Sequence, residues 1–228
     1  MFPLNDSEPN RYSAWPLMTL LIVVVNAVVL CFEWTLPDDA LKGMFYLFGS
    51  TSHLVLTRQG GGALVSLTST FLHADFWHWL SNMWALWVFG RRVEDACGAW
   101  RFLCYYLVCG LCADAMSSII LYNSHIPSIG ASGAIFGVMG AYLILFPGGR
   151  IRTLLPLWFI PTFPRIRAFW IILYFMVFQI IPAMLILVNG AEYGIGYWAH
   201  LGGFFSCFFI FLFLRPEAFA HYWAGEPI

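Results

Sequence analysis

Long apolar runs separated by more polar connections set the pattern of this chain. A helix of about 20 apolar residues crosses the hydrocarbon core of a bilayer, where lipid cannot satisfy the open edges of strands. Each run therefore predicts a membrane-spanning helix. The six predicted spans are Trp15–Phe32, Phe76–Gly90, Trp100–Tyr122, Ser132–Phe146, Ala168–Val188 and Tyr197–Leu214. The fold class that we predict is an all-α integral membrane protein, a bundle of six transmembrane helices.

The chain divides into three consecutive parts. Residues 1–14 form a short N-terminal segment, residues 15–214 one six-span unit, and residues 215–228 a C-terminal tail. The first connection, Trp34–Thr70, is long and amphipathic in places, and it is too polar to cross the bilayer. We expect a structured loop that lies in the membrane interface, because loops of this length usually have a function.

Basic residues fall mostly in alternate connections. Nine of the eleven Lys and Arg residues would lie on one side of the membrane: Arg11, Arg91, Arg92, Arg101, Arg150, Arg152, Arg165, Arg167 and Arg215. Only Lys42 and Arg58 would lie on the other. The positive-inside rule then predicts that both termini are cytoplasmic. The long first loop and the loops Asn123–Ile129 and Asn189–Gly196 are expected to face outward.

Composition agrees with a membrane protein. The chain is 61% hydrophobic and 10% charged, whereas a soluble domain has roughly a quarter of charged residues. A net charge of −1 argues against nucleic-acid binding, which needs a basic face. No signal peptide is visible before the first run, which we expect to remain as a span. The six cysteines all lie in or beside apolar runs, so we expect small buried hydrophobes and neither disulfides nor a zinc site.

Two small-residue surfaces accompany a serine and a histidine. Ser132 opens the fourth span beside Gly133, Gly137 and Gly140. On the sixth span, His200 lies about one turn in, and the small residues Gly196, Ala199 and Gly203 recur at spacings of three and four. Such small residues let helices pack closely. Since both spans begin on the outer side, we expect contact between them to bring His200 to Ser132.

The second span adds polar groups at the same depth. His78 and Asn82 are four residues apart and share a helix face, with His73 at or before the first turn. We expect Asp75 to cap this helix. Asp114, midway along the third span, is interpreted as a buried hydrogen-bonded residue, with a proton relay or a third catalytic member as alternatives.

The set permits acyl-transfer chemistry. Ser132 with His200 would form a nucleophile and its general base. His78, Asn82 and the backbone N–H of Ser132 would donate to an oxyanion. The sequence has no obvious acid beside His200, because Glu192 lies in the preceding loop, so we expect a dyad that needs no metal or cofactor. Phe136 shares a face with Ser132 and could pack against His200.

These residues also carry a family resemblance. The motifs are Gly130-Ala-Ser132-Gly133, Ala199-His200-Leu-Gly-Gly203, His73-x4-His78-x3-Asn82 and Gly90-x3-Glu94-x3-Gly98. Together with the six-span layout and the long outward first loop, the set resembles the rhomboid intramembrane serine proteases. The resemblance implies that Ser132 is the nucleophile, His200 the base, and His78 and Asn82 parts of the oxyanion hole, with His73 near the site. It implies substrates that are transmembrane segments of other proteins, cut near their outward ends, and a location in the bilayer that we expect to be a bacterial inner membrane.

Two positions depart from the family pattern. Phe136 stands where bacterial members often have a tyrosine under the catalytic histidine, and Leu64-Val65 stands where many have a Trp-Arg pair. Neither change removes a catalytic group. The family also suggests that the fifth span and the Asn189–Gly196 loop act as gate and lid.

Three alternatives stay open at this point. A zinc enzyme could use His73, His78 and His200, although no HExxH motif is present. A non-catalytic relative could bind membrane proteins without cleaving them. A transporter or channel would need Asp114 to connect to polar residues in both halves of the bundle.

Overall fold

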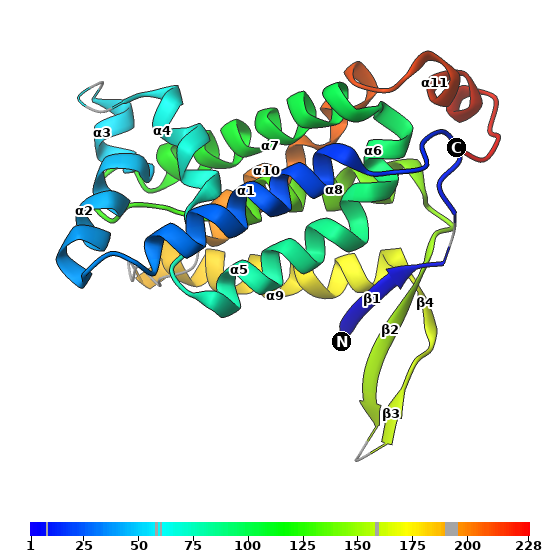
Figure 1. Ribbon diagram of the computed structural model, residues 1–228, viewed down its shortest axis with the longest axis horizontal. Helices are drawn as coiled ribbons and strands as arrows, with labels where there is room; N and C mark the ends of the chain where they lie inside the picture. Colours follow the sequence, from blue (N-terminus) through cyan, green and yellow to red (C-terminus); the bar gives the residue numbers. More distant parts are fainter. Residues whose placement is uncertain (8, 58, 60, 158–159, 190–195) are drawn as a thin grey trace.

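The computed structural model describes residues 1–7, 9–57, 59, 61–157, 160–189 and 196–228. Most of the chain is helical, and the longer helices run side by side along the long axis of the molecule (Figure 1). The predicted lid lies mostly outside this description, as do Arg58 and Glu192.

Every predicted span is helical. The helices are α1 (Leu17–Glu33), α5 (Phe76–Ala85) with the π-helical turn η2 (Leu86–Gly90), α7 (Ala99–Ile120), α8 (Ser132–Leu145), α9 (Ala168–Asn189), and α10 (Tyr197–Phe205) with the 3-10 segment η3 (Ser206–Leu212). Two shorter helices follow spans: α6 (Arg91–Cys97) and α11 (Pro216–Trp223). The helix boundaries agree with the apolar runs within a few residues. Apolar segments in lipid form helices because a helix satisfies its own backbone hydrogen bonds.

Length alone identifies fewer spans than the six predicted. Among the described residues, α7 and α9 are each long and apolar enough to cross a membrane. The pair Tyr197–Leu212 and Pro216–Trp223, bent by 100°, would be a third if it formed one span, and α1 and α8 are shorter apolar helices. The chain is thus a multi-pass membrane protein with apolar helices, and the count of six remains a prediction.

The long first connection is largely helical. It contains α2 (Asp38–Phe48), α3 (Ser52–Leu56), α4 (Ala63–Thr68) and the 3-10 turn η1 (Ser69–Phe71), all at the end of the molecule opposite α6 and α11 (Figure 1). Backbone bonds tie it to the segment that follows α7: Ser50 pairs with Ser128, and His53 N–H donates to the Ser124 carbonyl. The connection therefore packs on the end of the bundle near Ser132.

A small antiparallel sheet corrects the all-α prediction. Its strands are β1 (Phe2–Asp6), β2 (Arg150–Leu157), β3 (Ile160–Thr162) and β4 (Arg165–Arg167), and β2 pairs with each of the other three. Strands can form here because the sheet lies outside the helical bundle (Figure 1). In β2 the exposed Arg150 and Arg152 alternate with the buried Ile151 and Thr153, a period of two that is typical of a strand.

The N-terminal segment is ordered by buried charges. Asp6 lies 3.2 Å from the Arg92 guanidinium and accepts a 2.9 Å hydrogen bond from the Tyr142 hydroxyl. The Glu94 carboxylate accepts hydrogen bonds from the N–H groups of Met18 and Thr19, in the first turn of α1. These first-turn groups have no acceptor within their own helix. Acidic side chains thus fasten the chain start and α1 to the bundle.

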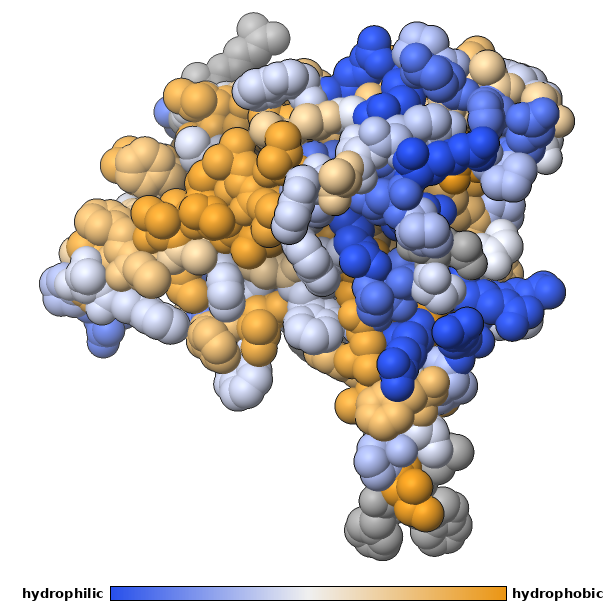
Figure 2. All heavy atoms as spheres, turned by 45° about the vertical axis from the view of Figure 1, so that its right-hand side comes forward, coloured by the Kyte–Doolittle hydropathy of each residue, from blue (hydrophilic) through white to orange (hydrophobic). Residues whose placement is uncertain are grey.

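The surface separates by polarity. Figure 2 shows a broad apolar area on one part of the molecule and hydrophilic residues gathered at the other. Many large apolar side chains are exposed, including Val28 (63%), Trp170 (57%) and Val188 (79%). A soluble monomer rarely exposes so many large apolar side chains in one broad area. The surface therefore agrees with immersion in lipid.

Candidate active site

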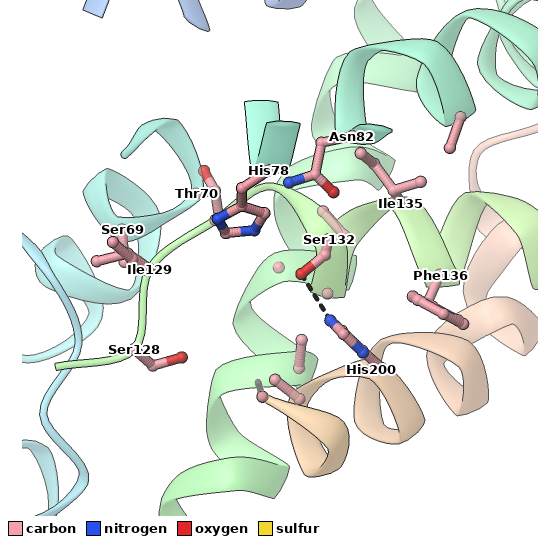
Figure 3. A pocket seen from close by; sticks show the side chains of 18 of the residues that line it. Ser69, Thr70, His78, Asn82, Ser128, Ile129, Ser132, Ile135, Phe136 and His200 are labelled. Atoms are coloured by element: carbon pink, nitrogen blue, oxygen red, sulfur yellow. Dashed lines mark hydrogen bonds between the residues drawn. The ribbon is translucent and has the colours of Figure 1, made fainter. Parts of the chain in front are cut away.

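A cavity of about 450 Å³ opens among α5, α8, α9 and α10. Figure 3 shows its polar side chains converging from separate elements. The lining includes most of the residues singled out in the sequence: His78, Asn82, Gly130, Ser132, Gly133, Phe136, Ala199 and His200. His73 and Gly203 are placed beside this cavity and do not line it.

Ser132 and His200 are in direct contact. The Ser132 Oγ lies 2.7 Å from His200 Nε2, and the pair is drawn as a dashed line in Figure 3. Ser132 is the first residue of α8, and His200 lies one turn inside α10, where its N–H donates to the Gly196 carbonyl. A hydroxyl in this position can pass its proton to the imidazole.

The small residues bring α8 and α10 together, as predicted. A Cβ added at Gly203 would collide with the backbone carbonyl of Gly133. One added at Gly137 would lie 2.9 Å from the Gly203 carbonyl oxygen. The backbones are therefore too close for any larger residue at Gly203, and this approach allows His200 to reach Ser132.

Phe136 packs under the histidine. Its ring is stacked on the His200 imidazole with centroids 4.6 Å apart and planes inclined by 16°. Since Phe136 is one turn beyond Ser132 on α8, a single helix supplies both the hydroxyl and the aromatic support. The predicted contact is confirmed.

Gln179 is a site residue that the sequence analysis missed. Its Oε1 lies 2.6 Å from His200 Nδ1, on the side of the ring opposite Ser132. The sequence led us to expect no acid beside His200, and the partner found there is a neutral amide, which we did not anticipate. The signal was present: Gln179 is an amide inside the apolar run Ala168–Val188, and polar residues in such runs are functional candidates.

His78 and Asn82 form the opposite wall. The predicted cap is confirmed, because the Asp75 carboxylate accepts a 2.9 Å hydrogen bond from the N–H of His78. Asn82 is 6% exposed, and its Nδ2 has no hydrogen-bond partner among the described residues. Gly130 has a φ of +121°, and a Cβ there would lie 2.8 Å from His78 Nε2, so only glycine suits this position.

His73 lies behind this wall. Its ring meets the His78 ring edge-on with centroids 5.1 Å apart, and its backbone N–H donates to Glu33 of α1. Burial lowers the pKa of His73 to about 3, and the His78 charge acts in the same direction. The imidazole is neutral at pH 7, and it buttresses His78 without entering the cavity.

Asp114 accepts a hydrogen bond from the Ser66 hydroxyl, which links α7 to α4. This contact agrees with the structural interpretation of Asp114. Among the described residues, no group of three or more His, Cys, Asp or Glu side chains is placed to share a metal ion, so the three histidines do not converge on one point.

The six cysteines are free. Cys97, Cys109 and Cys207 are buried, whereas Cys31 and Cys104 are exposed, contrary to the expectation that all would be buried.

Fold and site together define a helical membrane protein with a hydrogen-bonded serine–histidine pair in a cavity. Residues 62–217 match the Rhomboid domain model, which is more than half of the chain. The chain therefore belongs to the Rhomboid family.

Named relatives span several lineages. The chain is 30% identical over 144 residues to the mouse protein named "Presenilin-associated rhomboid-like protein, mitochondrial", covering 62% of this chain and 35% of that protein. It is 38% identical over 87 residues to yeast "Rhomboid protein 1, mitochondrial" (36% and 25%), and 44% identical over 84 residues to Bacillus subtilis "Rhomboid protease GluP" (37% and 16%). The matches thus span about a third or less of the length of these relatives.

Proposed function

We propose that this protein is an intramembrane serine endopeptidase that hydrolyses peptide bonds near the ends of transmembrane segments. The observation that carries the proposal is the 2.7 Å contact between Ser132 Oγ and His200 Nε2, inside a cavity with polar donors on its far wall. Membership of a family that includes a protein named as a protease supports the same reading.

The proposed reaction starts with the Ser132 hydroxyl. His200 Nε2 takes its proton while Oγ forms a bond to the scissile carbonyl carbon, and the carbonyl π electrons move to the oxygen. The tetrahedral intermediate collapses, the C–N bond breaks, and His200 returns the proton to the leaving amine. Water then hydrolyses the acyl ester by the same route and restores Ser132.

The oxyanion needs donors that are already in place. The proposed set is the Asn82 amide, whose buried Nδ2 has no partner in the described part of the chain, the His78 imidazole, and the N–H of Ser132 in the first turn of α8. The positive end of the α8 dipole favours the negative charge. Gly130 keeps the backbone close enough for the His78 ring to face the cavity.

We further propose the membrane arrangement expected from the sequence: six spans, cytoplasmic termini, and an active site that opens outward. This orientation is supported by arginines at one end of the molecule, in α6, β2 and β4. The two relatives named as mitochondrial conflict with the expectation of a bacterial inner membrane. We therefore propose no particular cellular membrane for this protein. The proposal is that it is a multi-pass membrane protein whose substrates are other membrane proteins.

Reconstitution into proteoliposomes tests the function. A single-span substrate with Gly or Pro near one end, where local unwinding costs less, is incubated with wild type, Ser132→Ala and His200→Ala. We expect cleavage by the wild type and loss of cleavage in both variants, with thermal unfolding close to that of the wild type. A wild type that binds the substrate without cutting it would instead identify a non-catalytic family member.

A further inference from the structure

Gln179 occupies an unusual position on α9. The inward-facing residues of this helix recur at spacings of three and four: Ile172, Met176, Gln179, Ala183 and Ile186. The other four are buried and apolar, with exposures between 0% and 6%. A lone amide in a stripe that seats a helix against its neighbours costs free energy unless it is hydrogen-bonded, so its contacts are informative.

Both ends of this amide have partners. Its Nε2 donates a 3.2 Å hydrogen bond to the Phe175 carbonyl, one turn earlier in α9, and Oε1 lies 2.6 Å from His200 Nδ1. The nitrogen can only donate and the oxygen can only accept. The bond to Phe175 therefore fixes the orientation of the amide, with its oxygen toward His200.

This orientation determines the tautomer of His200. Because Gln179 Oε1 cannot donate, Nδ1 must carry the proton in the 2.6 Å bond. In a neutral imidazole the other nitrogen, Nε2, is then unprotonated. Its lone pair faces the Ser132 hydroxyl, and the N–O distance is 2.7 Å. That is the form in which a histidine can accept the serine proton.

The partner stands on a different helix from the pair that it serves. Ser132 is on α8 and His200 on α10, whereas Gln179 comes from α9, whose outer side is exposed at Phe178 (56%) and Ile181 (57%). Three residues further on, Pro182 lies inside α9. It lacks the N–H that would bond to the Phe178 carbonyl, so the helix is weakened next to the contact.

We propose that Gln179 is a positioning residue that links the packing of α9 to catalysis: its amide oxygen holds His200 in the base-competent tautomer only while α9 is packed against α10. This inference rests on the proposed protease function. It makes the serine–histidine pair a three-membered chain, Ser132–His200–Gln179, with a neutral amide in third place.

The test compares two near-isosteric variants of the full chain in proteoliposomes. Gln179→Met keeps the length of the side chain and offers only a weak thioether acceptor, whereas Gln179→Glu keeps a strong oxygen acceptor. We expect kcat to fall by roughly 10- to 100-fold in Gln179→Met, the range found when a partner that sets a histidine's tautomer and orientation is removed, with KM nearly unchanged. Gln179→Glu should recover most of that loss. Phe178→Ala, on the exposed side of α9, serves as the control with wild-type kinetics.

Two further readouts separate positioning from packing. The ¹⁵N spectrum of His200 should report protonated Nδ1 in the wild type and a mixture of tautomers in Gln179→Met. Ala183→Leu, at a fully buried α9 position, should displace the helix and lower kcat, with less effect once Gln179 is Met, because the two changes break the same link.

The outcomes are distinct from failure of the proposed function. If wild type cleaves and Gln179→Met matches it in kcat and in the His200 spectrum, the inference is wrong although the protease assignment stands. Equal loss in Gln179→Met and Gln179→Glu, with an unchanged tautomer, would also overturn it in favour of packing alone. If wild type and Ser132→Ala are equally inactive, the protease assignment itself fails.

Discussion

Asn82 shows how a single buried donor can be assigned a role. The amide is almost fully buried, and its Nδ2 lacks a partner among the described residues although burial of an unsatisfied donor is costly. This cost in stability is expected at a site that binds a substrate oxygen. A donor that is already in position needs no reorganisation when negative charge develops on that oxygen.

We expect Asn82→Ala to lower kcat by about 10²- to 10³-fold, the range found when one oxyanion donor is removed. The measurement is cleavage of the single-span substrate, with fluorophosphonate labelling of Ser132 to count intact sites. Asn26→Ala is the matched control, since Asn26 is a buried asparagine of α1 that bonds to the Ile22 carbonyl. A similar fall in kcat for both variants would point to loss of folding and not to a lost donor.

At the scale of elements, contact between α8 and α10 governs the site. Their glycines remove the side chains that would otherwise hold the helices apart, and the serine and histidine sit where this contact begins. The sequence pattern of small residues predicted the contact because helix approach depends on side-chain size at fixed spacing.

Gly203→Ala is therefore expected to separate the two helices and lengthen the Ser132–His200 distance. The added Cβ meets the Gly133 backbone, which cannot move aside as a flexible side chain would. We expect a loss of about 1–3 kcal/mol in stability, as for overpacking elsewhere, together with loss of cleavage. Thermal unfolding and the substrate assay measure both.

Gly43→Ala is the control for the same substitution. Gly43 is exposed in α2, and a Cβ there meets nothing within 4 Å. Replacing glycine by alanine in an open helical position stabilises the helix by as much as about 1 kcal/mol. This variant should therefore be at least as stable as the wild type and fully active. Wild-type activity in Gly203→Ala would show that the close approach is not required.

The whole molecule is polarised along its helices. The long first connection lies at one end, and the sheet, α6 and α11 lie at the other (Figure 1). The proposed topology assigns these ends to opposite sides of the membrane, because the arginines of α6, β2 and β4 lie at the second end.

Cysteine labelling tests this arrangement. In a chain with its native cysteines replaced, Lys42→Cys in α2 should react with an impermeant maleimide from the outer side, and Phe2→Cys and Glu226→Cys only from the inner side. All three positions are exposed. Labelling of Phe2→Cys and Glu226→Cys from different sides would require an odd number of spans and would contradict the proposed topology.

Prediction from the sequence reached the helices and the central pair. Each apolar run was correctly predicted to be helical, and the spacing of small residues correctly predicted that the helices of Ser132 and His200 are in contact. These are local properties of the chain, since periodicity and composition are set by neighbouring residues. The strand β1 was missed because its partner lies far along the chain, and no local signal specifies such a pairing. The local pairing of β2 with β3 and β4 did have a signal, the alternation at Arg150–Thr153, which the search for apolar runs passed over.

Tertiary structure alone decided which polar groups meet across elements. Nothing in the run Ala168–Val188 states how α9 is rotated about its axis, and that rotation is what directs Gln179 to His200. The same holds for Asp6 with Arg92 and for Glu33 with His73. Local sequence patterns were enough to predict helices that pack closely and carry a serine and a histidine at their contact. Packing of separate helices then selected their hydrogen-bond partners, because such bonds depend on angles and distances between elements that are remote in the chain.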